Sequence, residues 1–182
     1  MNAVPPVHVP LRLCLDLNVW CAHYWSIENG RSGRTSHFLV EVIRTGTCSL
    51  GTVQLIISWG MLNRLRQVLE TKFEASQHKI DQYLDVIVGY AQLQEALGPS
   101  LTLGGTGLVP IRDEEDAHVI DTAIAGDADI LVTANFRDFL PRHVEILTPG
   151  RLARIAHPKG HLLIAHLYTA RDWLSSGSIL LP

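Results

Sequence analysis

Acidic and polar side chains stand directly after several apolar runs of this chain, at positions far apart in the sequence. In chain order they are Asp16, Asp113, Asp116, Thr133, Asn135 and Asp138. If the apolar runs are parallel strands, their carboxyl ends meet at one edge of a sheet, where ligands bind in open α/β folds. Two carboxylates about 4 Å apart repel by roughly 4 kcal/mol at an effective dielectric constant of ~20, so a cluster favours a bound cation. Oxygen ligands suit Mg²⁺ or Mn²⁺, and the pattern therefore predicts metal-assisted phosphate chemistry.

Each of these side chains also has a structural alternative. Asp16 and Asp113 could each cap the start of a helix, and Asp116 in a first helical turn could offset the helix dipole. Residues 133–135 could be an ordinary turn, and Asp138 could make a local hydrogen bond. The convergence of these side chains at one sheet edge is what favours a site.

Alternating strands and helices are the elements that would position these residues. Strands are expected at residues 11–15, 53–57, 108–111, 129–133 and 144–147. Helices are expected at residues 19–27, 36–43, 76–97 and 115–125, and after the capping residue Ser58. Such alternation forms parallel strands with helices on both faces. We therefore predict an α/β fold, a three-layer doubly wound parallel sheet, whose main domain spans residues 1–150.

Residues 151–182 are predicted to form a helical C-terminal extension of the same domain. Leu163, Leu167, Ala170 and Leu174 share one stripe at helical spacing. This stripe could cover the core of the domain itself or bind a partner.

The composition favours one globular domain without a membrane segment. Of the 182 residues, 47% are hydrophobic and 18% are charged, with a net charge of −3. No apolar run approaches the ~20 residues of a membrane span, and residues 1–10 do not resemble a signal peptide. The net charge argues against coating nucleic acid through bulk charge, although it leaves room for a local basic groove. The three cysteines and nine histidines lack metal-ligand spacing, which favours reduced thiols in a cytoplasmic protein.

Two segments carry motifs that are specific to one family. The first is Asp16-Leu17-Asn18-Val19. The second contains Asp113-x-x-Asp116, then Ala123-Ile-Ala-Gly126-Asp-Ala-Asp129, and then Thr133-x-Asn135-x-x-Asp138-Phe139. Over residues 11–150 the chain resembles PIN domains, in the branch of VapC-like toxin ribonucleases that has the T-x-N-x-x-D-F motif.

The resemblance implies a PIN-like nuclease that uses Mg²⁺ or Mn²⁺ to cleave RNA. By motif match, Asp16 is the first metal carboxylate, Asp116 is the central one, and Asn135 takes the place of the fourth polar ligand. These three are therefore the expected catalytic residues. Asp113 and Asp138 are further candidate ligands.

The resemblance also implies partners and supporting residues. Asn18, Thr133 and Arg64 are expected to contact substrate or to adjust the site. Many relatives are the toxin of a bacterial toxin–antitoxin pair and form homodimers. RNA, an antitoxin protein and a second copy of the chain are therefore the expected partners.

Arg64 departs from the family pattern. Relatives usually place a Glu six residues after the position of Ser58, and this chain has Arg64 there. The departure supports an alternative, in which the chain is a catalytically weakened PIN-like module that binds RNA or protein. A more remote alternative is a phosphatase of the haloacid-dehalogenase type. That class needs an acid where this chain has Asn18, and a lysine that is absent between Arg112 and Arg142.

Overall fold

The strands of the chain form one mixed sheet. The computed structural model describes residues 9–93, 101–102, 114–136 and 144–182, with the backbone alone at 101–102 and 114–117. The described strands are β1 (Leu11–Leu15), β2 (Thr47–Cys48), β3 (Gly51–Ser58), β4 (Leu101–Thr102), β5 (Ile130–Thr133), β6 (Glu145–Thr148), β7 (Leu152–His157) and β8 (Gly160–His166). Across the sheet they follow the order β2-β3-β1-β5-β8-β7-β6, and β4 pairs with β3.

The centre of the sheet is parallel and its outer parts are antiparallel. β4, β3, β1, β5 and β8 pair in parallel, whereas β2 pairs antiparallel with β3, and β6, β7 and β8 form antiparallel pairs. The predicted α/β class with parallel strands is confirmed. The sheet is mixed rather than wholly parallel because β6, β7 and β8 are joined by short turns, and a parallel connection needs a dozen or more residues.

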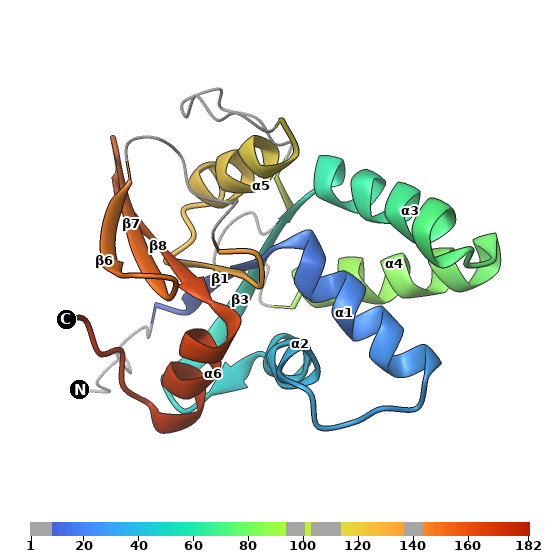
Figure 1. Ribbon diagram of the computed structural model, residues 1–182, viewed down its shortest axis with the longest axis horizontal. Helices are drawn as coiled ribbons and strands as arrows, with labels where there is room; N and C mark the ends of the chain where they lie inside the picture. Colours follow the sequence, from blue (N-terminus) through green and yellow to red (C-terminus); the bar gives the residue numbers. More distant parts are fainter. Residues whose placement is uncertain (1–8, 94–100, 103–113, 137–143) are drawn as a thin grey trace, which may run out of the picture.

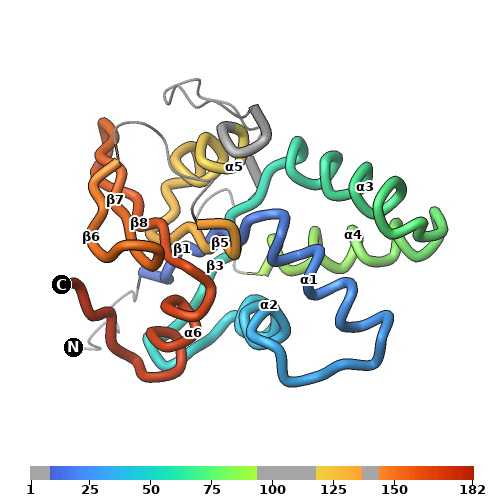
Figure 2. Tube along the Cα trace, in the orientation of Figure 1, coloured from blue at the N-terminus to red at the C-terminus, as the bar shows by residue number. Residues whose placement is uncertain are grey.

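Helices lie on both faces of the sheet, as predicted. The described helices are α1 (Leu17–Glu28), α2 (Thr35–Thr45), α3 (Trp59–Phe73), α4 (Gln77–Ala91), α5 (Glu114–Ala125) and α6 (Leu167–Ser176). Figure 1 shows α5 on one side of the strands and α2 and α6 on the other, while α3 and α4 extend away as a pair. The chain trace in Figure 2 shows β8 and α6, near the C-terminal end, beside β5 and α2 respectively.

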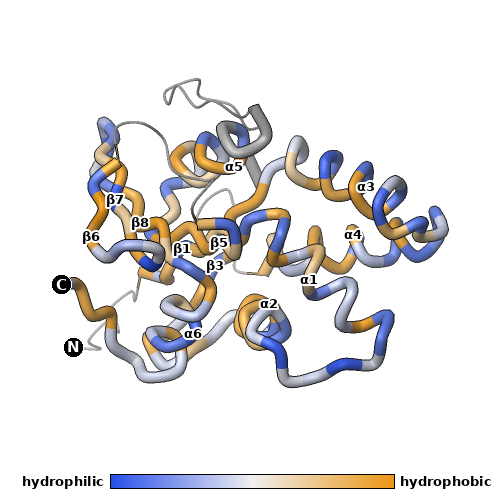
Figure 3. The backbone as a smooth tube through the Cα atoms, viewed as in Figure 1, coloured by the Kyte–Doolittle hydropathy of each residue, from blue (hydrophilic) through white to orange (hydrophobic). Residues whose placement is uncertain are grey.

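The core is built from strands that are buried over most of their length and contain apolar runs such as Leu13-Cys14-Leu15 and Leu55-Ile56-Ile57. Leu13, Cys14 and Leu15 of β1 are fully buried, and so is most of β3 and β5. A strand covered by helices on both faces needs such continuous apolar runs rather than alternation. Figure 3 shows the apolar residues gathered in the strands and polar residues on the outer turns of α3.

The prediction that residues 151–182 are helical is wrong over their first half. Leu152–His157 and Gly160–His166 form a β-hairpin, and the helix begins only at Leu167. Leu162 to Ala165 are four consecutive buried residues, which suits a strand covered on both faces. Because Leu163 pairs with Ile130 of β5, it does not share the stripe of Ala170 and Leu174.

Two local features concern the start of α3, where a cap is predicted, and the motif glycine that follows α5. The hydroxyl of Ser58 accepts a hydrogen bond from the backbone N–H of Met61 at 3.2 Å, so the predicted cap of α3 is confirmed. Gly126 lies where α5 packs against β3, and a Cβ atom there would come within 2.2 Å of Cγ2 of Ile56. This close approach explains why the second motif needs glycine at that position.

Two further sequence predictions concern residues 108–111 and membrane spans. The strand expected at residues 108–111 lies outside the described residues. Among the helices that the structure describes, none is long and apolar enough to cross a membrane.

Candidate functional site

The carboxyl ends of β1 and β5 place Asp16 next to Thr133. The two strands pair in parallel, with Leu15 opposite Val132, and the N–H of Asp16 donates to the carbonyl of Val132 at 2.9 Å. Asp16 also occupies the N-cap position of α1, but its side chain makes no capping hydrogen bond. The N–H groups of Leu17 and Asn18 nevertheless lower the pKa of this carboxyl, so the start of α1 also favours its charged form.

Thr133 and Asn18 hold the carboxylate of Asp16. The hydroxyl of Thr133 donates to Oδ2 of Asp16 at 2.7 Å, and the Asn18 amide donates to the same oxygen. The Asn18 amide also lies 3.1 Å from Oγ1 of Thr133. These residues belong to two segments more than 100 positions apart, and the sheet joins them into one network.

The same network fixes the turn that carries Asn135. Oδ1 of Asn18 accepts from the N–H of Ala134 at 3.0 Å, and Oγ1 of Thr133 accepts from the N–H of Asn135 at 3.0 Å. Asn135 is exposed and lines the same cavity as Asp16. Asn18 and Thr133 therefore position both of the expected ligand side chains that the structure describes.

Burial makes the charge on Asp16 costly. The residue is 5% exposed, and burial raises the pKa of its carboxyl from 3.8 to about 6. The hydrogen bonds from Thr133 and Asn18 and the N–H groups at the start of α1 lower this pKa, but burial outweighs them. The described hydrogen bonds on this carboxylate all come from neutral donors, so a nearby cation would stabilise its charge.

A cavity of about 370 Å³ opens beside this network. It is lined by Asp16, Leu17, Asn18, Cys21, Val68, Lys72, Phe73, Val119 and Asn135. Lys72 is exposed and brings a positive charge to the cavity wall. The sequence analysis did not single out Lys72. The signal that could have found it is helical spacing, because Val68 and Lys72 follow Arg64 by one and two turns.

Arg64 lies one turn before this cavity rather than in its wall. Its side chain is half-buried, and its Nη1 donates to Oε1 of Gln67 on the same helix at 3.0 Å. The cation that lines the cavity from α3 is Lys72. Arg64 precedes Val68 by one turn and Lys72 by two, on the side of α3 from which those two residues line the cavity.

The acidic residues of the second motif are only partly described. Asp116 lies in the first turn of α5, three residues before Val119, which lines the cavity. Residues three apart are neighbours on a helix surface, so α5 brings the backbone of Asp116 to this side of the fold. Asp113 and Asp138 lie outside the described residues. Among the side chains that the structure describes, no group of three His, Cys, Asp or Glu is arranged to hold a metal ion.

Cys21 lines the cavity as a thiol rather than as a reactive thiolate. Burial, with the charge of Asp16, raises the pKa of Cys21 to about 11. The thiolate is the nucleophilic form of cysteine, and it is scarce at neutral pH when the pKa is raised this far. The cavity chemistry therefore depends on its oxygen-bearing side chains.

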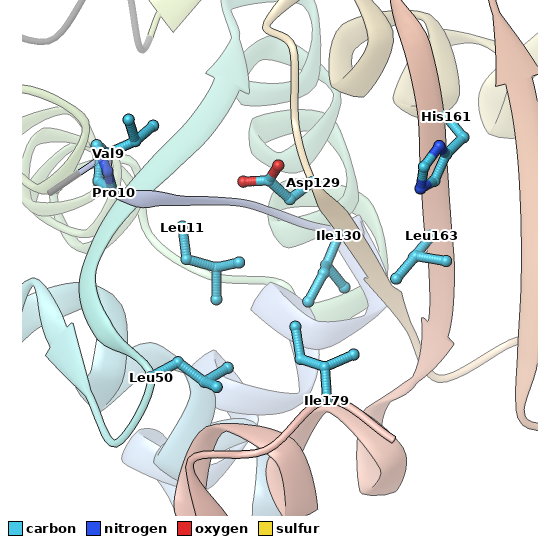
Figure 4. A pocket seen from close by; sticks show the side chains of 9 residues that line it. All are labelled: Val9, Pro10, Leu11, Leu50, Asp129, Ile130, His161, Leu163 and Ile179. Atoms are coloured by element: carbon cyan, nitrogen blue, oxygen red, sulfur yellow. The ribbon is translucent and has the colours of Figure 1, made fainter. Parts of the chain in front are cut away.

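A second cavity, of about 500 Å³, lies at the opposite edge of the sheet. Its walls include the beginnings of β1, β5 and β8, and Figure 4 shows Leu11, Ile130 and Ile179 pointing toward one another within it. The carboxylate of Asp129 in this cavity accepts from the N–H of Arg12 at 2.7 Å. Because ligands of parallel sheets bind at the carboxyl ends of strands, the Asp16 cavity is the better candidate.

Comparison with protein families gave a match. A family model described as PIN domain matches residues 12–137, which cover β1 through the turn after β5. The chain therefore belongs to the PIN-domain family and has a nuclease-type fold. The match favours this class over the haloacid-dehalogenase phosphatase. Comparisons with curated proteins and with solved structures gave no significant match.

Proposed function

We propose that the chain is a divalent-metal-dependent ribonuclease whose catalytic centre is the cavity at Asp16. The observation that carries the proposal is a buried carboxylate of raised pKa, held by Thr133 and Asn18, at the carboxyl edge of a PIN-domain sheet. Burying an ion without a compensating charge is costly. The buried Asp16 carboxylate is therefore a candidate for a functional role that depends on its charge.

The donor set fits Mg²⁺ or Mn²⁺. Asp16, Asp116 and Asn135 would hold the ion, with Asp113 and Asp138 as further candidates. All of these ligands are oxygen donors, which both ions prefer. When bound, the ion would supply an activated water and charge stabilisation for the leaving oxygen of a phosphodiester.

Other residues of the chain would prepare this centre for RNA. Thr133 and Asn18 keep the Asp16 carboxylate in one orientation, because three hydrogen bonds join the three side chains. The ammonium of Lys72 at the cavity wall would attract a backbone phosphate. The phosphate of the RNA backbone would then lie next to the Asp16 carboxylate and the ion that it binds.

Asp116→Asn tests the proposed metal centre. We expect Mn²⁺ affinity and RNA cleavage each to fall by at least about 100-fold, since a charged ligand contributes several kcal/mol to such a centre. Calorimetry with Mn²⁺ alone and cleavage of a labelled RNA measure the two effects. Asp85→Asn, an exposed residue of α4, is the matched control. Unchanged Mn²⁺ affinity in Asp116→Asn would remove Asp116 from the centre.

The finer biological role is also a proposal. The resemblance to VapC-like toxins supports a cytoplasmic toxin of a toxin–antitoxin pair that forms a homodimer and is neutralised by an antitoxin protein. A small neighbouring reading frame whose product binds this chain and blocks RNA cleavage is the expected finding. Growth unaffected by expression of the chain alone would count against the toxin role.

Arg64 favours a second candidate, a PIN-like module that binds RNA or protein and cleaves weakly. An acid usual in relatives is absent, and a cation stands in its place. We expect Arg64→Glu to raise Mn²⁺ affinity about tenfold, or about 1.4 kcal/mol, and to raise RNA cleavage with it. Arg66→Glu is the control, because Arg66 pairs with Asp81 of α4 instead. Equal Mn²⁺ affinity in wild type and Arg64→Glu would show that position 64 does not act on the centre.

A further inference from the structure

A cluster of one cation and two aromatic rings lies one strand away from the Asp16 cavity. His166 ends β8 and is paired in register with Thr133 of β5, whose hydroxyl binds Asp16. Tyr168 is the second residue of α6, and Arg151 lies in the turn before β7. We call Arg151, His166 and Tyr168 the hairpin-end cluster. Figure 2 shows β8 leading into α6 beside β5.

The Tyr168 ring lies against both of the other side chains of the hairpin-end cluster. The ring centroids of His166 and Tyr168 are 5.1 Å apart, and Cζ of Arg151 lies 5.9 Å from the centroid of the Tyr168 ring. The backbone also ties them together, because the N–H of His166 donates to the carbonyl of Arg151 at 2.8 Å. The arrangement therefore holds an aromatic face and a guanidinium at a fixed place beside the site.

Exposure distinguishes Tyr168 from a core aromatic. The residue is 52% exposed, so much of its surface contacts solvent. Trp25 is similarly exposed, at 46%, but it packs against Phe73 at the far end of α1. Tyr168 instead combines exposure with a cation and a position next to the proposed catalytic centre. Aromatic rings and nearby cations in this combination bind single-stranded nucleic acid, by stacking on bases and contacting phosphates.

The spacing suits a nucleotide that flanks the cleaved phosphate. Neighbouring strands lie roughly 4.8 Å apart, so β8 is roughly 10 Å from β1, which carries Asp16 at its end. A single RNA strand that crosses the cavity would reach the hairpin-end cluster with its next bases. Bases of a duplex are stacked within the helix, whereas bases of a single strand can splay onto a protein ring.

We propose that the hairpin-end cluster is a base-stacking subsite for single-stranded RNA. Tyr168 stacks on a base that flanks the scissile phosphate, and Arg151 contacts the adjoining phosphate. His166 packs against Tyr168 and keeps its ring in place. This inference rests on the proposed ribonuclease function, because it assigns the subsite to the substrate of the same centre.

Binding without metal tests the subsite separately from cleavage. The probe is a short fluorescent single-stranded RNA, with EDTA present so that no cleavage occurs, and the measurement is anisotropy. Tyr168→Ala is expected to weaken binding about tenfold or more, which is the effect of removing one stacking ring. Tyr168→Phe is expected to keep the wild-type affinity because it keeps the ring. Trp25→Ala, which removes an equally exposed ring elsewhere, is expected to have no effect.

Arg151 is tested by the salt dependence of the same binding. Arg151→Gln is expected to reduce the slope of log affinity against log salt by about one, as for one lost phosphate contact. Arg154→Gln is the matched control, because Arg154 pairs with Glu145 on the neighbouring strand. The melting temperature of each variant shows that it is folded.

The outcomes separate this inference from the proposed function. Equal RNA affinity in wild type and Tyr168→Ala overturns the subsite, even if the wild type cleaves RNA. If Tyr168→Ala weakens binding of duplex RNA as much as binding of single-stranded RNA, Tyr168 does not act by stacking on a base. A selective loss of single-strand binding supports the subsite even if the metal-loaded wild type does not cleave RNA, in which case the nuclease proposal alone fails.

Discussion

Asp16→Asn is expected to remove RNA cleavage while making the metal-free fold more stable. We expect cleavage to fall by at least about 100-fold, because a ligand of the proposed metal centre loses its charge. In EDTA at neutral pH, we expect the free energy of unfolding to rise by about 2 to 3 kcal/mol. Urea denaturation with and without Mn²⁺ measures the second effect.

The stability gain follows from the raised pKa of Asp16. Burial is its main cause, and it raises the pKa from 3.8 to about 6. A shift of about 2 units corresponds to about 3 kcal/mol at ~1.36 kcal/mol per unit. Because the folded pKa is above the unfolded one, this stability is present below pH 3.8 and lost as pH rises through about 6. Asparagine imitates the uncharged form and avoids that loss.

The effects of Asp16→Asn are compared with those of a control variant and with the effect of Mn²⁺. Asp85→Asn makes the same chemical change on the exposed face of α4 and is expected to alter neither quantity. Mn²⁺ is expected to stabilise the wild type but not Asp16→Asn. A metal-free Asp16→Asn that unfolds at lower urea than the wild type would contradict the idea that the charge strains the fold.

The core of the site could be predicted from sequence because its parts are local. Asp16 and Thr133 each follow a short, mainly apolar run, which is consistent with a buried strand that ends at a polar residue. Ser58 likewise marks the start of α3 by its type and place. The carboxyl-edge rule for parallel sheets then joins these ends without knowledge of side-chain contacts.

The C-terminal half of the sheet could not be predicted in the same way. Leu162 to Ala165 form a short apolar run, and periodicity alone does not separate a buried strand from a buried helix segment. What decides in favour of a strand is pairing with β5, more than 25 residues earlier in the chain. Lys72 was missed for a related reason, since its role depends on how α3 packs beside α1.

His23 is expected to make the fold lose stability in mild acid. The residue is buried on α1, and Tyr83 of α4 lies 2.9 Å from its Nδ1. Since the Tyr83 hydroxyl donates to the carbonyl of Trp20 at 3.0 Å, Nδ1 of His23 carries the hydrogen that donates to Tyr83. Burial, with the nearby His37 of α2, lowers the pKa of His23 from 6.5 to about 4, although Glu41 of α2 raises it.

The sign of this effect is opposite to that of Asp16. Because the folded pKa of His23 is depressed, its contribution is fully present above pH 6.5 and is lost as pH falls toward about 4. The loss is about 2 kcal/mol, once partial screening by solvent is allowed for. Protonation of Asp16 raises the stability of the fold over part of the same pH interval. The pH dependence of the wild type therefore shows only the difference between the contributions of His23 and Asp16.

His23→Phe separates the two contributions. Phenylalanine keeps an aromatic ring against Tyr83, whose hydroxyl still has the carbonyl of Trp20 as acceptor. We expect urea denaturation at a series of pH values to show a weaker loss toward acid than in the wild type, by about 2 kcal/mol. His78→Gln, an exposed histidine of α4, is expected to leave the profile unchanged. If His23→Phe and the wild type lose stability in parallel, protonation of His23 is not the cause of the stability loss in acid.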